Sequence, residues 1–135
     1  MSAENVEIVR SAIALFNAGD FEAGLDVAHP DVVFRDLQNA PDLPEVLEGR
    51  DSLARVLAHW LDVYDEFRVE VHDYVDADPW VIADVRWYGK GKGSDLSVDV
   101  RQVDMCRVRD GQIVEWIAGY PDMTTAIEAA GSSRG

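Results

Sequence analysis

The sequence has little positive charge. Its 12 Lys and Arg residues stand against 26 Asp and Glu residues, a formal net charge of −14 at pH 7, and its lysines are Lys90 and Lys92. This excess of negative charge repels a phosphate backbone and an anionic lipid surface. We therefore expect no nucleic acid and no membrane as a partner, and most of the acidity is explained by solubility.

Cysteine, long apolar runs and clustered histidines are also scarce. The single cysteine, Cys106, excludes an internal disulfide and is typical of a reducing compartment. No apolar run approaches the ~20 residues that span a bilayer, and no basic segment followed by an apolar one opens the chain. His29, His59 and His72 are isolated, so no metal site is indicated. We expect a cytoplasmic protein that uses no cofactor.

The length and composition indicate one globular domain. The chain has 135 residues, 47% hydrophobic and 28% charged, which is too apolar for a disordered chain and close to the usual size of one domain. The sequence predicts a single domain over residues 1–135, with a core at about 4–130 and a mobile tail at 131–135.

Helices precede strands along the chain. Apolar residues at helical spacing predict helices at 5–18, 21–28, 51–64 and 123–130. Alternating residues and turn signals predict strands at 32–37, 67–76, 80–88, 96–109 and 112–120, with loops at 38–49 and 89–95. This order predicts an α+β fold, in which N-terminal helices wrap one face of a curved antiparallel or mixed sheet and close a conical interior pocket.

Two carboxylates stand apart from the others because their neighbours on the strand are apolar. Asp104 shares the less charged face of strand 96–109 with Gln102, and Asp36 ends strand 32–37 on the face of Phe34. A carboxylate on an apolar face is unfavourable unless it is paired, protonated or functional.

Each of these carboxylates has two interpretations. Asp104 is either a pocket acid or a structural carboxylate paired with an arginine such as Arg86 or Arg101. Asp36 is either functional or a cap for the proline-bearing loop that follows it. Aromatic residues on nearby elements favour a small-molecule pocket around both. The residues predicted to bind the ligand are Phe16, Phe34, Trp60, Tyr64, Gln102, Trp116 and Tyr120.

Short segments along most of the chain resemble a known family. They read ENVEIVR at 4–10, FNAGD at 16–20, PDV at 30–32, GR at 49–50, FRVEV at 67–71 and RDGQIV at 109–114. These segments resemble the SnoaL-like branch of the nuclear transport factor 2-like superfamily. The superfamily includes polyketide cyclases, ketosteroid isomerases, epoxide hydrolases, dehydratases and binding modules, so the resemblance is specific for fold rather than activity. It implies a conical α+β barrel, usually a homodimer through the outer sheet face.

The resemblance also implies site residues. Asp36 matches the general-base aspartate of ketosteroid isomerases, and Asp104 matches their protonated oxyanion-hole aspartate. Ala12 stands where those enzymes keep a tyrosine, which leaves Tyr64 or Tyr120 to supply the hydroxyl.

Two other activities in the superfamily depend on an aspartate in the last strands. Ala118 stands where epoxide hydrolases keep the second aspartate of an Asp-Arg-Asp set, although Asp84 and Arg86 remain in a strand. Ala118 also replaces the aspartate of SnoaL-type cyclases, for which Asp104 would have to substitute.

The leading hypothesis is an isomerase-like or cyclase-like enzyme that transfers protons on a small apolar carbonyl compound. Asp36 would remove a proton next to the carbonyl, and a neutral Asp104 would stabilise the enolate with help from Gln102 or Tyr120. The first alternative is a non-catalytic ligand-binding or dimeric interaction module, and the second is epoxide hydration.

Overall fold

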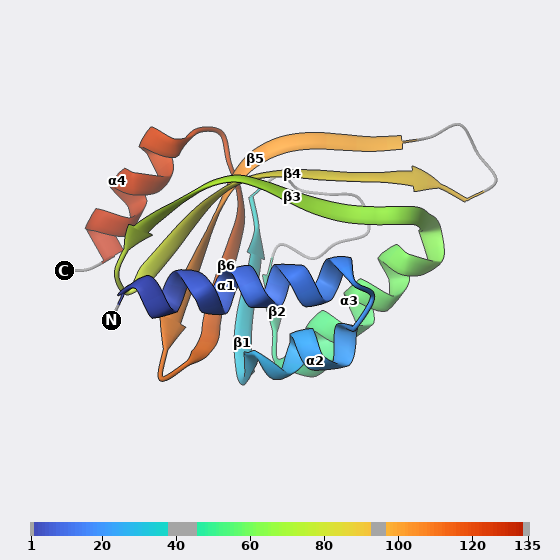
Figure 1. Cartoon of the computed structure of the whole chain (residues 1–135), viewed down its shortest axis with the longest axis horizontal. Coiled ribbons are helices and arrows are strands. Elements are labelled where there is room, and N and C mark those ends of the chain that lie inside the picture. The colour runs from blue at the N-terminus through green and yellow to red at the C-terminus, as the bar shows by residue number, and fades with distance from the viewer. Residues whose placement is uncertain (1, 38–45, 93–96, 134–135) are drawn as a thin grey trace.

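The structure is a computed structural model that describes residues 2–37, 46–92 and 97–133. Its helices are α1 (Ser2–Asn17), α2 (Phe21–Asp26), α3 (Arg50–Val63) and α4 (Met123–Ser133). Its strands are β1 (Ala28–Asp36), β2 (Val46–Glu48), β3 (Tyr64–Ala77), β4 (Trp80–Gly91), β5 (Ser97–Arg109) and β6 (Gln112–Tyr120). The α+β prediction is confirmed (Figure 1).

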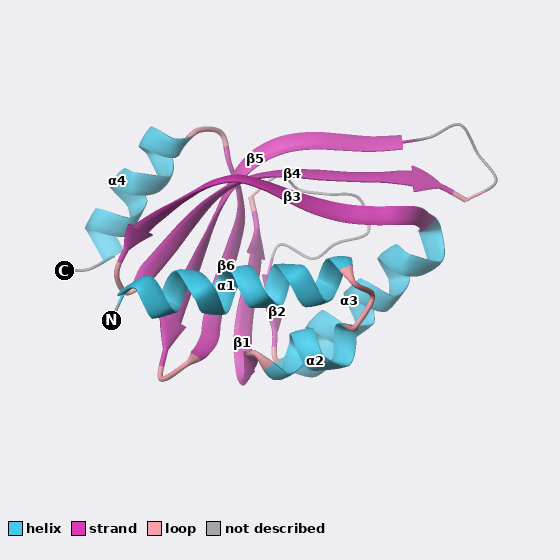
Figure 2. Cartoon of the chain, in the orientation of Figure 1, coloured by secondary structure: helices cyan, strands magenta, loops and turns pink. Residues whose placement is uncertain are grey.

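The strands form one mixed sheet in the order β2-β1-β6-β5-β4-β3. β1 runs parallel to β6, and the other neighbouring pairs are antiparallel. Figure 2 shows that the sheet is strongly bent and that β3, β4 and β5 extend beyond the other strands. This open, bent sheet provides a concave face for the helices to cover.

Helices cover both faces of the sheet. Val9 and Ile13 of α1 pack with Val85 and Cys106 in one buried cluster, whereas Ala126 of α4 packs with another. The second cluster contains Ile82, Val103 and Met105, which alternate along the strands with the members of the first. Successive residues of a strand point to opposite faces, so α1 and α4 lie on opposite sides of the sheet. We call the α1 side the inner face.

Two of the predicted loops are partly wrong. Val46–Glu48, inside the loop predicted for 38–49, forms β2 and pairs with β1, while β4 continues to Gly91 through the loop predicted for 89–95. Residues 38–45 and 93–95 of those loops, and residue 96 of the predicted strand 96–109, lie outside the described residues. Gly89 is buried, and a Cβ there would lie 2.7 Å from Cδ2 of Phe67. The glycine is thus used for close packing rather than for a turn.

A bulge changes the face of residues in β3. The register passes from Val71 opposite Val85 to Asp73 opposite Asp84, which leaves one additional residue on β3. Beyond it Tyr74 packs on the inner face and Val75 packs with the α4 cluster. Strict alternation predicts Val75 on the face of Val69 and Val71, which is the inner face, and this is wrong because an inserted residue reverses the pattern.

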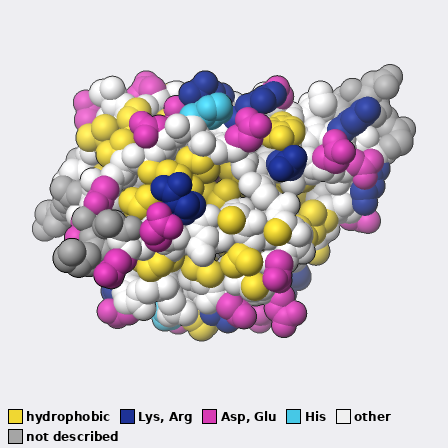
Figure 3. All heavy atoms as spheres, in the orientation of Figure 1, with side chains coloured by type: hydrophobic (Ala, Val, Ile, Leu, Met, Phe, Trp, Pro, Cys, Tyr) yellow, Lys and Arg dark blue, Asp and Glu magenta, His cyan; other side chains and the backbone are white. Residues whose placement is uncertain are grey.

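The outer face carries ion pairs where α4 does not cover it. Both guanidinium nitrogens of Arg86 that donate to Asp99 lie 2.7 Å from its carboxylate oxygens, and Arg101 binds Asp84 in the same paired manner at 3.2 and 2.9 Å. On the face drawn in Figure 3, acidic side chains are spread over the molecule with basic ones among them. None of the described helices is long and apolar enough to cross a membrane.

Candidate functional site

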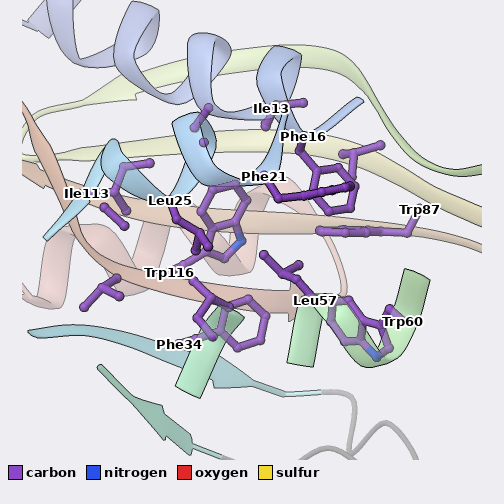
Figure 4. A pocket seen from close by; sticks show the side chains of 16 residues that line it. Ile13, Phe16, Phe21, Leu25, Phe34, Leu57, Trp60, Trp87, Ile113 and Trp116 are labelled. Carbon is purple, nitrogen blue, oxygen red and sulfur yellow. The ribbon is translucent and has the colours of Figure 1, made fainter. Parts of the chain in front are cut away.

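A cavity of about 90 Å³ lies between the helices α1–α3 and the inner face of the sheet. Among the described residues that line it, every side chain is aliphatic or aromatic, apart from one glycine. Figure 4 shows its larger side chains pointing toward one another, and the lining residues come from seven elements: α1, α2, α3, β1, β3, β4 and β6. Its aromatic members are Phe16, Phe21, Phe34, Trp60, Trp87 and Trp116. Such a wall suits a ligand with an apolar surface.

The aromatic rings of the wall pack edge to face. Phe16 and Trp60 lie with their ring centroids 6.0 and 6.2 Å from that of Trp87, at interplanar angles of 70° and 69°. Phe67 contacts all three rings from β3. This arrangement is favourable because the positive edge of one ring meets the negative face of another.

Asp104 lies behind this wall, with none of its surface exposed. Its Oδ2 accepts hydrogen bonds from the indole Nε1 of Trp116 at 3.0 Å and of Trp87 at 3.3 Å. Its Oδ1 accepts from Nε2 of Gln102 at 2.8 Å and from the backbone nitrogen of Gly119 at 3.2 Å. Both indole rings line the cavity, whereas Asp104 itself does not. The carboxylate therefore fixes two walls of the pocket from outside.

Burial raises the pKa of Asp104 to about 6, although the four hydrogen bonds oppose the rise. At neutral pH the carboxyl is therefore mostly ionised. An indole N–H and a backbone N–H can only donate, so this set of partners suits a carboxylate, which can only accept. Arg86 and Arg101 bind other carboxylates on the outer face, so the alternative that one of them pairs with Asp104 is wrong.

A second bulge brings the donor of Gly119 to Asp104. Val103 is opposite Tyr120 but Asp104 is opposite Ala118, so Gly119 is the additional residue on β6. Its φ of +104° is accessible to glycine and strained for other residues. Because Gly119 is outside the regular ladder, its N–H is able to reach the carboxylate of Asp104.

Asp36 lies in the same row of the sheet as Asp104. Each of them is the register partner of Ala118, on opposite sides of β6. Two strand spacings therefore separate their backbones, on the order of 10 Å. Asp36 is 5% exposed and follows Phe34 by two residues, so both side chains leave β1 on the same face.

Four of the seven predicted ligand contacts line the cavity: Phe16, Phe34, Trp60 and Trp116. The structure brings Gln102 next to Asp104 instead, and places Tyr64 against the ring of Phe67, with centroids 5.4 Å apart. Tyr120 packs with the α4 cluster, away from the cavity, so its predicted place in the pocket wall is wrong. The Gly119 bulge is the reason, because it moves the next residue to the other face.

Sequence reasoning missed part of the wall. Trp87 lines the cavity but is not among the residues predicted to bind the ligand. Its signal was its alternation with Val81, Ala83 and Val85, all of which are buried on the inner face. The sequence contains no separate indication that α2, including Phe21, lines the cavity. The helix has only 6 residues, too few for its apolar positions to indicate which face is buried.

Other predicted residues lie away from the cavity. Asp84 and Arg86, which would belong to an epoxide hydrolase set, lie on the outer face. There Asp84 binds Arg101 and Arg86 binds Glu70. His59 is exposed, and Cys106 is buried with a pKa well above its ordinary value because of desolvation. In the described ranges, no group of three or more His, Cys, Asp and Glu side chains is arranged to hold a metal ion.

Solved structures share this fold across nearly the whole chain. TerC, co-crystallised with polyporic acid, is 19% identical with a TM-score of 0.76, over 95% of this chain and 98% of TerC. A putative SnoaL-like polyketide cyclase from Jannaschia sp. CCS1 is 19% identical with a TM-score of 0.74, over 97% and 94% of the two chains. A protein with a ketosteroid isomerase-like fold from Catenulispora acidiphila, in complex with trimethylamine, is 18% identical with a TM-score of 0.73, over 93% and 92%.

The likeness to these structures establishes the fold alone. Comparison with curated protein sequences gave no significant match. The profile of the SnoaL-like domain, however, matches residues 9–116, which include all the strands except the end of β6 and every residue that lines the cavity. The chain therefore belongs to the SnoaL-like domain family, as the resemblance of its short segments predicts.

Proposed function

We propose that the protein binds a small, largely apolar molecule in the cavity between α1–α3 and the sheet. The observation that carries this proposal is the wall itself, whose described side chains offer apolar surface from seven elements and whose two indole N–H groups, those of Trp87 and Trp116, are already bound to Asp104. The bound polyporic acid and trimethylamine of two proteins with this fold support a small-molecule site.

Tryptophan fluorescence offers a direct measure of binding. Trp60, Trp87 and Trp116 line the cavity, whereas Trp80, the remaining one of the four, packs with the α4 cluster. A ligand in the cavity is expected to change the emission of three tryptophans. Native mass spectrometry of the freshly purified protein shows whether a ligand is retained and gives its mass.

A pair of variants on α1 tests the location. Ala12 lines the cavity and Ala14 is exposed on the same helix. Ala12→Phe fills the space, so it should abolish the fluorescence response and the retained mass, whereas Ala14→Phe should preserve both. Equal behaviour of the two variants would place the ligand elsewhere.

We further propose proton transfer on a carbonyl compound, with Asp36 as the base. The support is geometric: Asp36 is a buried carboxylate that leaves β1 on the same face as the cavity residue Phe34. Asp36 does not itself line the cavity, but a carboxylate that reaches a bound carbonyl compound can remove a proton from the carbon next to the carbonyl. The enolate that forms then needs a hydrogen-bond donor.

The predicted donor, a neutral Asp104, would have to act under two conditions. The carboxyl would have to be protonated, and one of its four N–H partners would have to give way so that its O–H could turn toward the ligand. Trp116 is the alternative donor, since its ring lines the cavity and its Nε1–H is the group that the carboxylate now holds.

Hydrogen–deuterium exchange tests the base. A panel of cyclic ketones is incubated with the protein in D₂O, and loss of the proton next to the carbonyl is followed by NMR. Asp36→Asn should slow the exchange on any accepted ketone by at least about 100-fold and leave its binding nearly unchanged. Asp31→Asn removes an exposed carboxylate from the same strand and should have no effect. Exchange that survives in Asp36→Asn, or a protein that binds ketones without exchanging them, would favour the binding module.

A further inference from the structure

The buried carboxylate of Asp104 has no positive charge beside it in the described part of the chain. All four groups that donate to it are neutral: two indoles, one amide and one backbone N–H. An ionised carboxylate away from water is normally paired with a cation or a metal ion. The negative charge behind the cavity wall is thus hydrogen-bonded but not neutralised.

The groups that surround Asp104 do not supply a positive charge to balance its carboxylate. Cys106 follows it by two residues on the same face of β5, and Asp36 shares its row across β6. Burial raises the pKa of Cys106 and also of Tyr74, which lies further along the inner face on β3, so both are neutral near pH 7. Arg10, on α1, stacks over the ring of Tyr74 at 4.8 Å.

Several arginines around this face bind other groups, and Arg50 of α3 donates to the backbone carbonyl of the cavity residue Ala28. Arg10 binds Glu7 on the surface of α1 at 3.1 Å, and both side chains are more than half exposed, at 55% and 69%. The arginines of the adjacent strands, Arg86 and Arg101, point to the outer face and bind Asp99 and Asp84. The cavity lies on the other side of the two indole rings that donate to Asp104, so a positive charge bound there would face the carboxylate across those rings.

The electrostatic effect of this carboxylate reaches the cavity through two tryptophans. Trp87 and Trp116 donate their N–H groups to the carboxylate and present their rings to the cavity. Donation to an anion polarises the indole and makes the face of its ring more negative. Phe16 and Trp60 extend the aromatic wall on either side of Trp87, and such faces attract a cation that has few waters to lose.

We propose that the pocket selects a small organic cation, a tertiary or quaternary alkylammonium, over a neutral molecule of the same shape. A metal ion or a primary ammonium would lose strong hydration in a wall whose described side chains present no oxygen to replace it, whereas an alkylated ammonium presents an apolar surface around a diffuse charge. This inference rests on the proposed binding function and is independent of proton transfer by Asp36.

The test compares two probes that differ in charge alone. Choline and 3,3-dimethylbutan-1-ol have the same shape, with nitrogen in one replaced by carbon in the other. Their dissociation constants are measured at pH 8 by tryptophan fluorescence and calorimetry. Choline is expected to bind about tenfold more tightly, because a desolvated cation–ring contact contributes on the order of that factor or more.

Two further measurements identify Asp104 as the source of the preference. Asp104→Asn should reduce the ratio of the two constants to about one, whereas Glu128→Gln, an exposed charge on α4, should leave it unchanged. In the unmodified protein, the ratio should fall as the pH drops through about 6, where Asp104 takes up a proton. The pH series keeps the proposal testable even where Asp104→Asn does not fold.

The outcomes separate this proposal from the proposed function. Equal or tighter binding of the alcohol overturns the preference for a cation and leaves the small-molecule pocket standing. A preference for choline that persists in a folded Asp104→Asn variant, or that does not change between pH 5 and pH 8, overturns the role of the carboxylate. If neither probe binds, the cation site is overturned. If, in addition, Ala12→Phe changes neither the retained ligand nor the fluorescence, the proposal of a small-molecule pocket is overturned as well.

Discussion

The backbone N–H of Gly119 donates a hydrogen bond to Oδ1 of Asp104, at 3.2 Å, from a bulge in β6. This contact links the shape of the strand to the charge behind the pocket. The bulge turns one N–H toward the carboxylate and also moves Tyr120 to the opposite face of the sheet. A residue with a positive φ is needed at that point, which explains the glycine.

Gly119→Ala should therefore have two separable effects. The φ of +104° strains an alanine, so the free energy of unfolding should fall by about 1–3 kcal/mol. Displacement of the N–H should also raise the pKa of Asp104 further, because this hydrogen bond lowers it. The measurements are denaturant unfolding and a ¹³C NMR titration of the carboxyl.

Gly111→Ala is the matched control for this variant. Gly111 also has a positive φ, +79°, but lies in the turn between β5 and β6 and is exposed. It should lose stability without any change in the titration of Asp104. A shift of similar size in both variants would show that backbone strain, rather than the lost donor, controls the carboxyl.

The stability of the protein should depend on the ionisation of Asp104. Its pKa rises from 3.8 to about 6 on folding, so between these values the folded protein holds a proton that the unfolded chain has released. The resulting stabilisation is fully present below about pH 4 and is lost as the pH rises through about 6. The difference in pKa corresponds to about 3 kcal/mol.

Urea unfolding at a series of pH values measures this contribution. Asp104→Asn does not titrate, so the unmodified protein should lose about 3 kcal/mol relative to that variant between pH 4 and pH 7. Subtraction of the two curves removes the opposite trend of carboxylates with lowered pKa values, such as Asp84 and Asp122. Parallel curves would mean that Asp104 titrates alike in the folded and unfolded states.

The burial of Asp104 beside Gln102 was predictable from the sequence, but its other partners were not. A period of two along β5 places it among inward residues, and the structure confirms its burial. Its three donors other than Gln102 come from β4 and β6, and which residues of those strands lie opposite it depends on register. One additional residue on β6 sets that register. Arg86 and Arg101, the arginines predicted as possible partners of Asp104, lie on β4 and β5 but point to the outer face.

The errors in side-chain placement have the same origin. Periodicity predicted the inner residues of β4, where the register with β5 is continuous. It failed for Val75 and Tyr120, each of which follows a bulge. Gly119, an isolated glycine within a strand pattern, was the one local indication of such an irregularity. The bulge in β3 carries no glycine, so nothing in the residue types indicated it.

The two indole donors should contribute unequally to the acidity of Asp104. Trp116 donates at 3.0 Å and Trp87 at 3.3 Å, and both bonds lower the pKa of the carboxyl. Trp116→Phe should therefore raise that pKa further above 6 than Trp87→Phe does. Each variant should also lose about 1.5–3 kcal/mol of stability at pH 7, because it removes a hydrogen bond to a charged group.

Trp60→Phe provides the comparison for these variants. Trp60 lines the same cavity, and its contacts with Phe67 and Trp87 are made through its rings. It should lose packing energy and leave the ¹³C titration of Asp104 where it was. The order of effects would be contradicted if Trp60→Phe shifted the titration as much as Trp116→Phe.

The close contact at Gly89 predicts a large effect from a single methyl group. A Cβ on Gly89 would lie 2.7 Å from Cδ2 of Phe67 and 3.3 Å from Cβ of Tyr64, so the Phe67 ring must move against its aromatic neighbours. Gly89→Ala should destabilise the protein by about 1–3 kcal/mol, the usual range for overpacking a core. Chemical denaturation measures the loss of stability, and the near-ultraviolet circular dichroism of the aromatic cluster measures the displacement of the Phe67 ring.

Gly131→Ala is the matched control for Gly89→Ala, because it adds a methyl group where there is open space. Gly131 lies in α4, and a Cβ there would meet nothing within 4 Å. Alanine is favoured over glycine in a helix by up to about 1 kcal/mol, so this variant should be neutral or more stable, with an unchanged aromatic spectrum. If Gly89→Ala were as well tolerated as Gly131→Ala, Phe67 would have room to move. The aromatic wall that holds Trp87 would then be looser than its ring contacts indicate.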